Sequence, residues 1–282
     1  PVPPAAERGA AASGREVMIV GESRMVFKTP LLQRIYDGIR EERDPEFSFF
    51  SDKRIPWAGP LASLAGARIA LVSSAGLHEV GDEPFDCLFS LFGDTSFRVI
   101  PHGSDRVDIN APYVDKKYVL HDLEVALPMK ALDRLHEEKR VGAPAAHHFS
   151  FCGGIVHPLP GLHESAVRIA ETLREDGADA DVLLPTCSLC VQTMAIVARE
   201  LESLGFRTVA VSLIPELSEI VGVPRTLTVH FPFGAPCGNP GHGELHRSVF
   251  LEALSMLVDS SAPGEIRASR NVWRKTPTDA GE

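Results

Sequence analysis

The chain has 282 residues, 44% of them hydrophobic, with a formal net charge of −10 and a pI of about 5.6. This length suits one large α/β domain or two lobes that share an interface. The acidic balance and the lack of a basic cluster exclude a nucleic-acid-binding protein, because phosphates need a basic face. No apolar run approaches the ~20 residues of a membrane span, and five cysteines are too few for a disulfide framework in such a chain. We therefore expect a cytoplasmic protein with reduced thiols and no membrane partner.

Helices and strands are expected to alternate along the chain. The Pro/Ala/Gly-rich composition of residues 1–13 predicts disorder. Apolar residues at helical spacing predict helices at 30–42, 129–140, 162–176, 189–204 and 244–258. Short apolar or β-branched runs predict strands at 68–73, 96–101, 119–127, 147–151, 181–184, 208–213 and 226–231. Between them we expect a polar loop at 102–117, a turn-rich loop at 232–243 and, within an amphipathic stretch, a core position for Cys87.

This alternation predicts an α/β fold with mostly parallel sheets flanked by helices on both faces. It allows a division into two Rossmann-like lobes near residue 145. The predicted parts are a disordered segment at 1–13, an N-terminal α/β lobe at 14–145, a C-terminal α/β lobe at 146–260 that carries a Cys-x-x-Cys motif, and a tail at 261–282.

Cys187 and Cys190 stand at the turn between a predicted strand and a predicted helix. The first turn of a helix offers unpaired N–H groups and the positive end of the helix dipole, and both favour a thiolate. The spacing places the second cysteine about one turn behind the first, close enough for a disulfide. Such a Cys-x-x-Cys indicates redox chemistry. Two cysteines that merely pack in the core, or a structural zinc site, are the alternatives, although no second Cys-x-x-Cys is present.

Other thiols also follow predicted strands. In open α/β sheets ligands bind beyond the carboxyl ends of the strands, which draws Cys152, Cys237 and the Cys187–Cys190 pair toward one edge. His148 and His242 can join them there. This convergence predicts an active site that contains Cys187.

The small turn after the strand at 68–73 contains Ser74 and Gly76. A turn of this kind can hold a carboxylate or a phosphate on its backbone N–H groups. It is not a glycine-rich phosphate loop, so a plain tight turn is the competing interpretation.

Residues 186–190 (TCSLC) resemble the B-subunit (selenoprotein B) family of the glycine, sarcosine, betaine and D-proline reductases, in which a cysteine or selenocysteine at a strand end is followed by two residues, a cysteine and a helix. Further segments resemble that family: 93–101 (GDTSFRVIP), Asp122 ahead of 125–128 (VALP), 148–154 (HFSFCGG) and 232–240 (PFGAPCGNP). The similarity covers roughly residues 60–258. Cys152 and Cys237 stand where apolar residues are common in the family, and cysteine stands at the nucleophile position, Cys187.

The resemblance implies reductive cleavage of a carbon–heteroatom bond, commonly carbon–nitrogen, in a small amine or amino-acid-like substrate. Cys187 would be the nucleophile and Cys190 the resolving thiol; His148 would be a general acid, or else only a hydrogen-bonded residue of its strand. The candidate substrate-binding residues are Ser74, Gly76, Asp122, Cys152 and Cys237. The resemblance implies no tightly bound cofactor, and an external dithiol, a thioredoxin-like protein or a selenoprotein A-like protein as reductant. A homo-oligomer is compatible with it.

Two other classes of function are open. Cys187, Cys190, Cys237 and His242 could hold zinc, iron or copper in a metal-binding protein. Alternatively, two thiols could act as acid and base in an isomerase or lyase.

Overall fold

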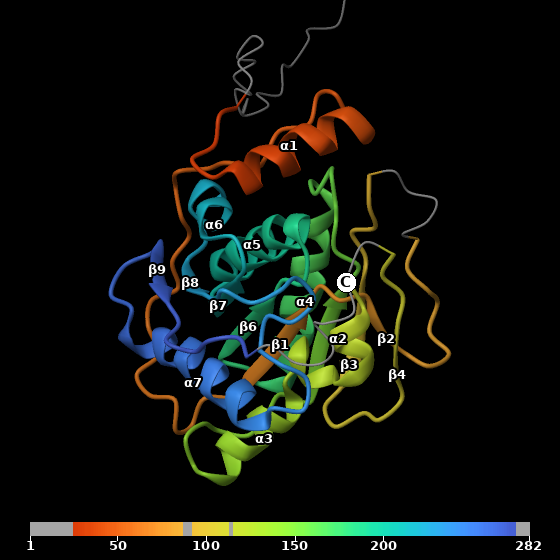
Figure 1. The fold of residues 1–282 in the computed structure, drawn as a ribbon. Coiled ribbons are helices and arrows are strands. Elements are labelled where there is room, and N and C mark those ends of the chain that lie inside the picture. Colours follow the sequence, from red (N-terminus) through yellow and green to blue (C-terminus); the bar gives the residue numbers. More distant parts are fainter. Residues whose placement is uncertain (1–24, 87–91, 113–114, 275–282) are drawn as a thin grey trace, which may run out of the picture.

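The computed structural model describes residues 25–86, 92–112 and 115–274 of the chain. Its centre is a seven-stranded sheet with the strand order β3-β5-β1-β6-β7-β8-β9, and β2 and β4 form a separate antiparallel ribbon (Figure 1). All neighbours in the large sheet are parallel except β3 and β5. The strands are β1 Ile69–Ser73, β2 Leu77–Glu79, β3 Phe97–Pro101, β4 Val107–Ile109, β5 His147–Phe151, β6 Ala180–Leu184, β7 Arg207–Ser212, β8 Arg225–Thr228 and β9 Glu265–Ala268.

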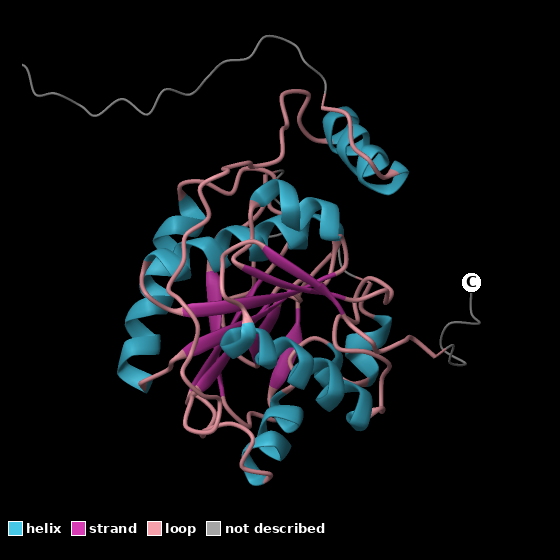
Figure 2. Ribbon diagram, turned by 90° about the vertical axis from the view of Figure 1, so that its left-hand side faces the viewer, coloured by secondary structure: helices cyan, strands magenta, loops and turns pink. Residues whose placement is uncertain are grey.

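Helices cover both faces of the sheet (Figure 2). Side chains of α1, α4, α5 and α6 pack in the core on one face, and those of α2, η1, α3 and α7 pack on the other. Alternate residues of the central strands face the two cores: Ala70 and Val72 one way, Ile69 and Leu71 the other. The helices are α1 Pro30–Glu42, α2 Lys117–His121, η1 Leu123–Val125, α3 Met129–Glu137, α4 Gly161–Asp176, α5 Ser188–Ser203, α6 Pro215–Val221 and α7 Gly243–Asp259. The predicted α/β class is confirmed.

Several predicted boundaries agree with the structure because local signals set them. Helix α1 begins after Thr29, whose hydroxyl accepts the backbone N–H of Leu32 at 3.4 Å, and Pro30 occupies its first turn. Helix α4 ends at Gly177, which has a φ of 66°. Since β1 lies between β5 and β6, a division near residue 145 would cut through one sheet. The division into lobes stays a prediction.

Three predicted elements are wrong. Residues 119–127 do not form a strand but contribute to α2 and η1. The predicted polar loop at 102–117 contains β4. The predicted tail at 261–282 contains β9, which pairs with β8 and extends the sheet. The predicted disorder at 1–13 and the predicted core position of Cys87 lie outside the described residues.

Within the described part of the chain, every helix is too short or too polar to cross a bilayer.

A buried ion pair ties the loop before β1 to the sheet. The Arg225 guanidinium on β8 contacts the Glu202 carboxylate of α5 at 2.5 Å, and both side chains are fully buried. The same carboxylate accepts the N–H of Ala58 at 2.6 Å and of Thr208 at 2.7 Å. Arg225 also lies 3.9 Å from the ring centroid of Trp57. This network therefore joins α5, β7, β8 and residues 57–59.

Replacing Arg225 by Met should destabilise the protein by about 3–5 kcal/mol, because Glu202 would remain buried without a counter-charge. Urea unfolding measures the change. The matched control is Arg34→Gln, which removes the same charge from an exposed position of α1 and should change the free energy of unfolding by less than about 0.5 kcal/mol. A loss below about 1 kcal/mol for Arg225→Met would contradict a role for the pair in stability.

Candidate active site

The Cys-x-x-Cys turn lies between β6 and α5, where the sequence predicts it. All residues of β6 are buried, and Cys187 then takes an extended conformation as the N-cap of α5. Its Sγ accepts the backbone N–H of Cys190 at 3.1 Å. The two sulfurs are joined in a disulfide with an S–S distance of 2.13 Å and a Cα–Cα distance of 4.8 Å. A helix amide therefore points at the sulfur of Cys187, as a thiolate there would require.

The pair sits in a small apolar cluster with Phe85, Ala111 and Cys152, and Ile109 packs against it. Cys187 is 8% exposed and Cys190 is fully buried. An incoming group therefore reaches Cys187 more readily than Cys190. The apolar surroundings favour neutral sulfur species, such as a thiol or a disulfide, over an isolated charge.

Hydroxyl groups fix the turn that precedes the pair. The Ser74 Oγ, just after β1, accepts the backbone N–H of Thr186 at 2.9 Å and lies 3.1 Å from the Thr186 Oγ1. The Thr186 Oγ1 in turn lies 3.7 Å from the Cys190 Sγ. Ser74 therefore lies beside the cysteines. Its hydroxyl is used in hydrogen bonds within the protein, to Thr186, and not in a ligand contact.

Two glycines allow the neighbouring loops to approach closely. A Cβ built on Gly153, after β5, would lie 2.2 Å from the Cys190 Sγ, so only glycine fits there while the sulfur keeps its place. Gly76 has a φ of 68°, and a Cβ there would lie 2.4 Å from the Asn110 carbonyl oxygen. Its N–H donates to the Phe151 carbonyl at 2.8 Å. Gly76 therefore allows the backbone after β1 to pack closely against Asn110 and Phe151.

The expectation of reduced thiols is corrected by the structure. Besides the Cys187–Cys190 disulfide, Cys152 is also disulfide-bonded, and of the cysteines in the described part of the chain only Cys237 is free. Cys152 lies in the same cluster as the pair, as the strand-end rule predicts. Its backbone forms an isolated bridge with Ala75 in the loop after β1.

Cys237 lies elsewhere. Its side chain is fully buried in the core on the α3 and α7 face, and its N–H donates to the Val125 carbonyl at 3.0 Å. Burial raises the pKa of the Cys237 thiol well above its usual range, and the nearby carboxylates of Glu124 and Asp122 add to the shift. Its loop still reaches the site, because the Gly234 N–H donates to the Thr186 carbonyl at 2.7 Å.

His148 is held inside the sheet. Its Nδ1 accepts the Leu71 N–H at 3.1 Å, so its Nε2 carries the proton and donates to the His102 Nδ1 at 2.8 Å. The His102 Nε2 then donates to the Asp133 carboxylate at 2.8 Å. Burial lowers the pKa of His148 to about 3, and the His102 and His147 rings add to the effect. Among the described residues, no hydrogen bond joins His148 to either cysteine of the pair.

Asp122 also has a local role. Its Oδ1 accepts the Glu124 N–H at 3.1 Å, which caps η1, and its Oδ2 accepts the Gly241 N–H at 2.7 Å. The alternative metal set is not assembled, since Cys237 packs in a different cluster from Cys187 and Cys190. Over residues 25–86, 92–112 and 115–274, no group of three His, Cys, Asp or Glu side chains is placed to hold a metal ion.

Thr186 and Gly153 belong to the site, although the sequence analysis did not indicate them. Thr186 and Gly153 both stand in the motif segments, but nothing in their spacing shows that they lie against the Cys190 sulfur. The sequence feature that could have identified them is their position next to Cys187 and Cys152. Their contacts depend on the pairing of β1 with β5 and β6, which brings these strand ends together.

The chain is similar to subunits of three reductases. It is 29% identical over 212 residues to the D-proline reductase subunit gamma of Acetoanaerobium sticklandii. The aligned region covers 74% of this chain and 86% of that protein. It is 26% identical over 226 residues (76% of this chain, 51% of the relative) to the glycine reductase complex component B subunit gamma of Symbiobacterium thermophilum. It is 25% identical over 221 residues (73% and 50%) to the betaine reductase complex component B subunit beta of Peptoclostridium acidaminophilum.

The chain therefore spans about half the length of the glycine and betaine reductase proteins. No protein-family model matches it, and no solved structure gives a significant match. The three relatives confirm the resemblance that the motifs indicate.

Replacing His148 by Gln should change how stability depends on pH. The pKa of His148 is lower in the folded protein than the unperturbed value of about 6.5, so its contribution is present above about pH 6.5 and is lost as the pH falls toward 3. At pH 5 the loss is about 2 kcal/mol relative to pH 7. The stability gap between wild type and variant should therefore shrink by about that amount when urea unfolding is compared at the two pH values.

His136→Gln is the control for that experiment, because His136 is exposed on α3. Its pH dependence should follow the wild type. A gap between wild type and His148→Gln that stays constant from pH 7 to pH 5 would show that His148 is not held neutral in the folded protein.

Replacing Gly153 by Ala should destabilise the oxidised protein by about 1–3 kcal/mol, because the new methyl group and the Cys190 sulfur cannot occupy the same space. Gly38→Ala is the matched control: nothing lies within 4 Å of its Cβ position in α1, and it should stabilise the helix by up to about 1 kcal/mol. Urea unfolding and counting of free thiols measure both. If Gly153→Ala matched the wild type in stability and thiol count, the close packing at Cys190 would be refuted.

Proposed function

We propose that this chain, a relative of the D-proline, glycine and betaine reductase subunits, is a thiol-dependent reductase whose redox pair is Cys187 and Cys190. Its substrate is a small amine or amino-acid-like molecule, and the bond cleaved joins carbon to a heteroatom, with carbon–nitrogen as the first choice. The observation that carries the proposal is the disulfide at the first turn of α5, at the strand ends where ligands of α/β folds bind.

The exposure of the two cysteine residues supports Cys187 as the nucleophile. It is the more exposed cysteine, and the Cys190 N–H stabilises negative charge on its sulfur. In the first step the Cys187 thiolate attacks the substrate carbon that bears the heteroatom. A carbon–sulfur bond forms, the carbon–heteroatom bond breaks, and the heteroatom leaves with its electron pair and takes up a proton.

Cys190 completes the reduction. Its thiolate attacks the Cys187 sulfur, the disulfide forms, and the carbon–sulfur bond breaks. The carbon leaves with the electron pair and takes up a proton. Because a carbanion is a poor leaving group, the substrate needs a neighbouring carbonyl or carboxyl group that can spread the charge. The substrate gains two electrons overall, and the dithiol becomes the disulfide that the structure contains.

A reductant must then restore the dithiol. The relatives are named as subunits or components of reductases, which supports partner proteins for this chain. An external dithiol, a thioredoxin-like protein or a selenoprotein A-like protein would attack the more exposed sulfur, Cys187. Two electrons and two protons per turnover close the cycle.

Replacing Cys187 by Ser should abolish turnover, because the hydroxyl is a far weaker nucleophile than a thiolate. Replacing Cys190 by Ser should stop the second step and trap an adduct on Cys187. Intact-mass spectrometry after incubation of the reduced proteins with candidate amines and amino acids detects the adduct as a mass increase in Cys190→Ser alone.

Cys237→Ala is the matched control, since Cys237 packs in a separate core and forms no disulfide. It should keep its turnover. The reduced wild type should lose two thiols per substrate molecule when no reductant is present, whereas acid–base chemistry by an isomerase or lyase would consume none. Full activity of both Cys187→Ser and Cys190→Ser would overturn the proposed function.

A further inference from the structure

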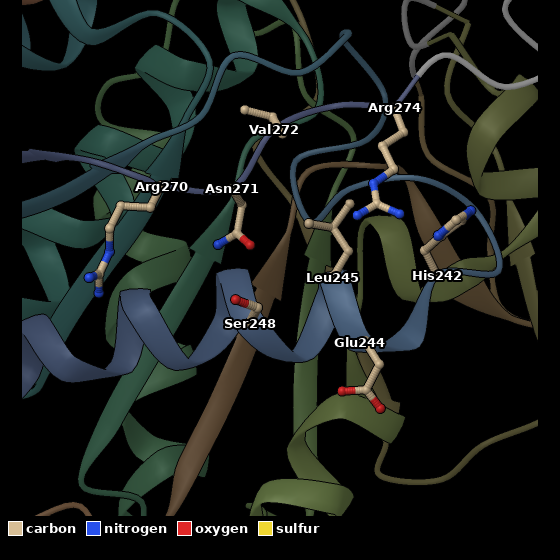
Figure 3. A pocket seen from close by; sticks show the side chains of 8 residues that line it. All are labelled: His242, Glu244, Leu245, Ser248, Arg270, Asn271, Val272 and Arg274. Atoms are coloured by element: carbon tan, nitrogen blue, oxygen red, sulfur yellow. The ribbon is translucent and has the colours of Figure 1, made fainter.

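A cavity of about 310 Å³ lies between the start of α7 and residues 269–274, the strap that follows β9 (Figure 3). This volume is at the lower end of the range for small-molecule sites. None of the four cysteines in the described part of the chain lines it. The cavity is lined by His242, Glu244, Leu245, Ser248, Arg270, Asn271, Val272 and Arg274.

The strap is fixed in place on the protein. The buried Asn239 side chain donates to the Arg274 carbonyl at 2.6 Å and accepts the Arg274 N–H at 3.1 Å. The Trp273 ring packs against Tyr118 and Phe231, with centroid distances of 5.2 Å and 5.8 Å. Further along, the Asn271 amide donates to the Glu252 carboxylate at 3.1 Å. The wall of the cavity is therefore preformed, which lowers the entropic cost of binding a ligand.

One positive charge in the cavity, that of Arg274, has no counter-charge among the residues that the structure describes. Arg270 pairs with Glu252 at 3.3 Å, and Glu244 pairs with Arg134. The Arg274 guanidinium makes no ion pair or hydrogen bond with any residue that the structure describes. Figure 3 shows it extending from the strap toward Leu245 and His242. The electrostatic balance of the lining therefore favours a ligand with a single negative charge over a dianion.

The other side chains that line the cavity indicate which kind of anion it can bind. Leu245 and Val272 supply apolar surface, and Ser248 supplies a hydroxyl on α7. A guanidinium matches the two oxygens of a carboxylate with two parallel N–H donors. We propose that this cavity binds a small organic monocarboxylate, with its carboxylate on Arg274 and its apolar part against Leu245 and Val272. This site is separate from the thiol pair and does not depend on the function proposed for it.

Sodium butyrate is a suitable probe, and its uncharged counterpart butyramide tests the need for the charge. Isothermal titration calorimetry of the full chain should detect binding of butyrate and none of butyramide. Replacing Arg274 by Gln should weaken butyrate binding at least about tenfold, as expected for loss of a charged hydrogen-bonding partner. Arg34→Gln removes the same charge from an exposed position of α1 and should bind butyrate as the wild type does.

Cys187→Ser should keep the butyrate affinity of the wild type, so that this proposal and the thiol chemistry fail independently. Any of three results would overturn the assignment: no binding of butyrate by the wild type, equal binding by Arg274→Gln, or tighter binding of inorganic phosphate than of butyrate. Thermal unfolding of Arg274→Gln checks that the variant is folded, and its melting temperature without ligand should match that of Arg34→Gln.

Discussion

The bond between the Ser74 hydroxyl and the Thr186 N–H is the contact on which the site depends. Strands β1 and β6 are buried on both faces, so a backbone N–H just beyond their ends needs a partner inside the protein. Ser74 supplies it at 2.9 Å and thereby sets where the chain turns into α5. The position of Cys187 as the helix N-cap, and of Cys190 one turn later, follows from that turn.

The cysteines combine two requirements that oppose each other. A thiolate needs nearby donors, and the helix amide of Cys190 is one. A disulfide is neutral and is compatible with the apolar side chains of Phe85, Ile109 and Ala111 that surround it. The environment therefore favours the neutral forms of the pair, the dithiol and the disulfide, over an isolated thiolate, and it exposes mainly Cys187 to a reductant. A metal ion held by the same sulfurs would need further charged ligands, which the described residues do not bring to this cluster.

The sequence predicts best what local signals determine. The starts of α1 and α5 follow from capping residues, the end of α4 follows from Gly177, and the buried strands follow from apolar runs. The interpretation of residues 119–127 as a strand is wrong because their apolar spacing fits either state, and packing against α7 and α3 selects helical turns. The contact of Gly153 with Cys190 was not predictable, since it joins strand ends whose neighbours are known only from the sheet order.

The loop between β8 and α7 connects the two places where small molecules are proposed to bind. At its beginning the Gly234 N–H donates to the Thr186 carbonyl beside the cysteines, and near its end Asn239 holds the strap that bears Arg274. The first contact joins two backbone groups, whereas the second is made by the Asn239 side chain with the backbone of Arg274, so the loop's conformation and this one side chain both matter. A shift of this loop would move the turn before Cys187 and the wall of the cavity together. The geometry thus provides a physical connection between the thiol pair and the cavity, although no residue of the pair lines it.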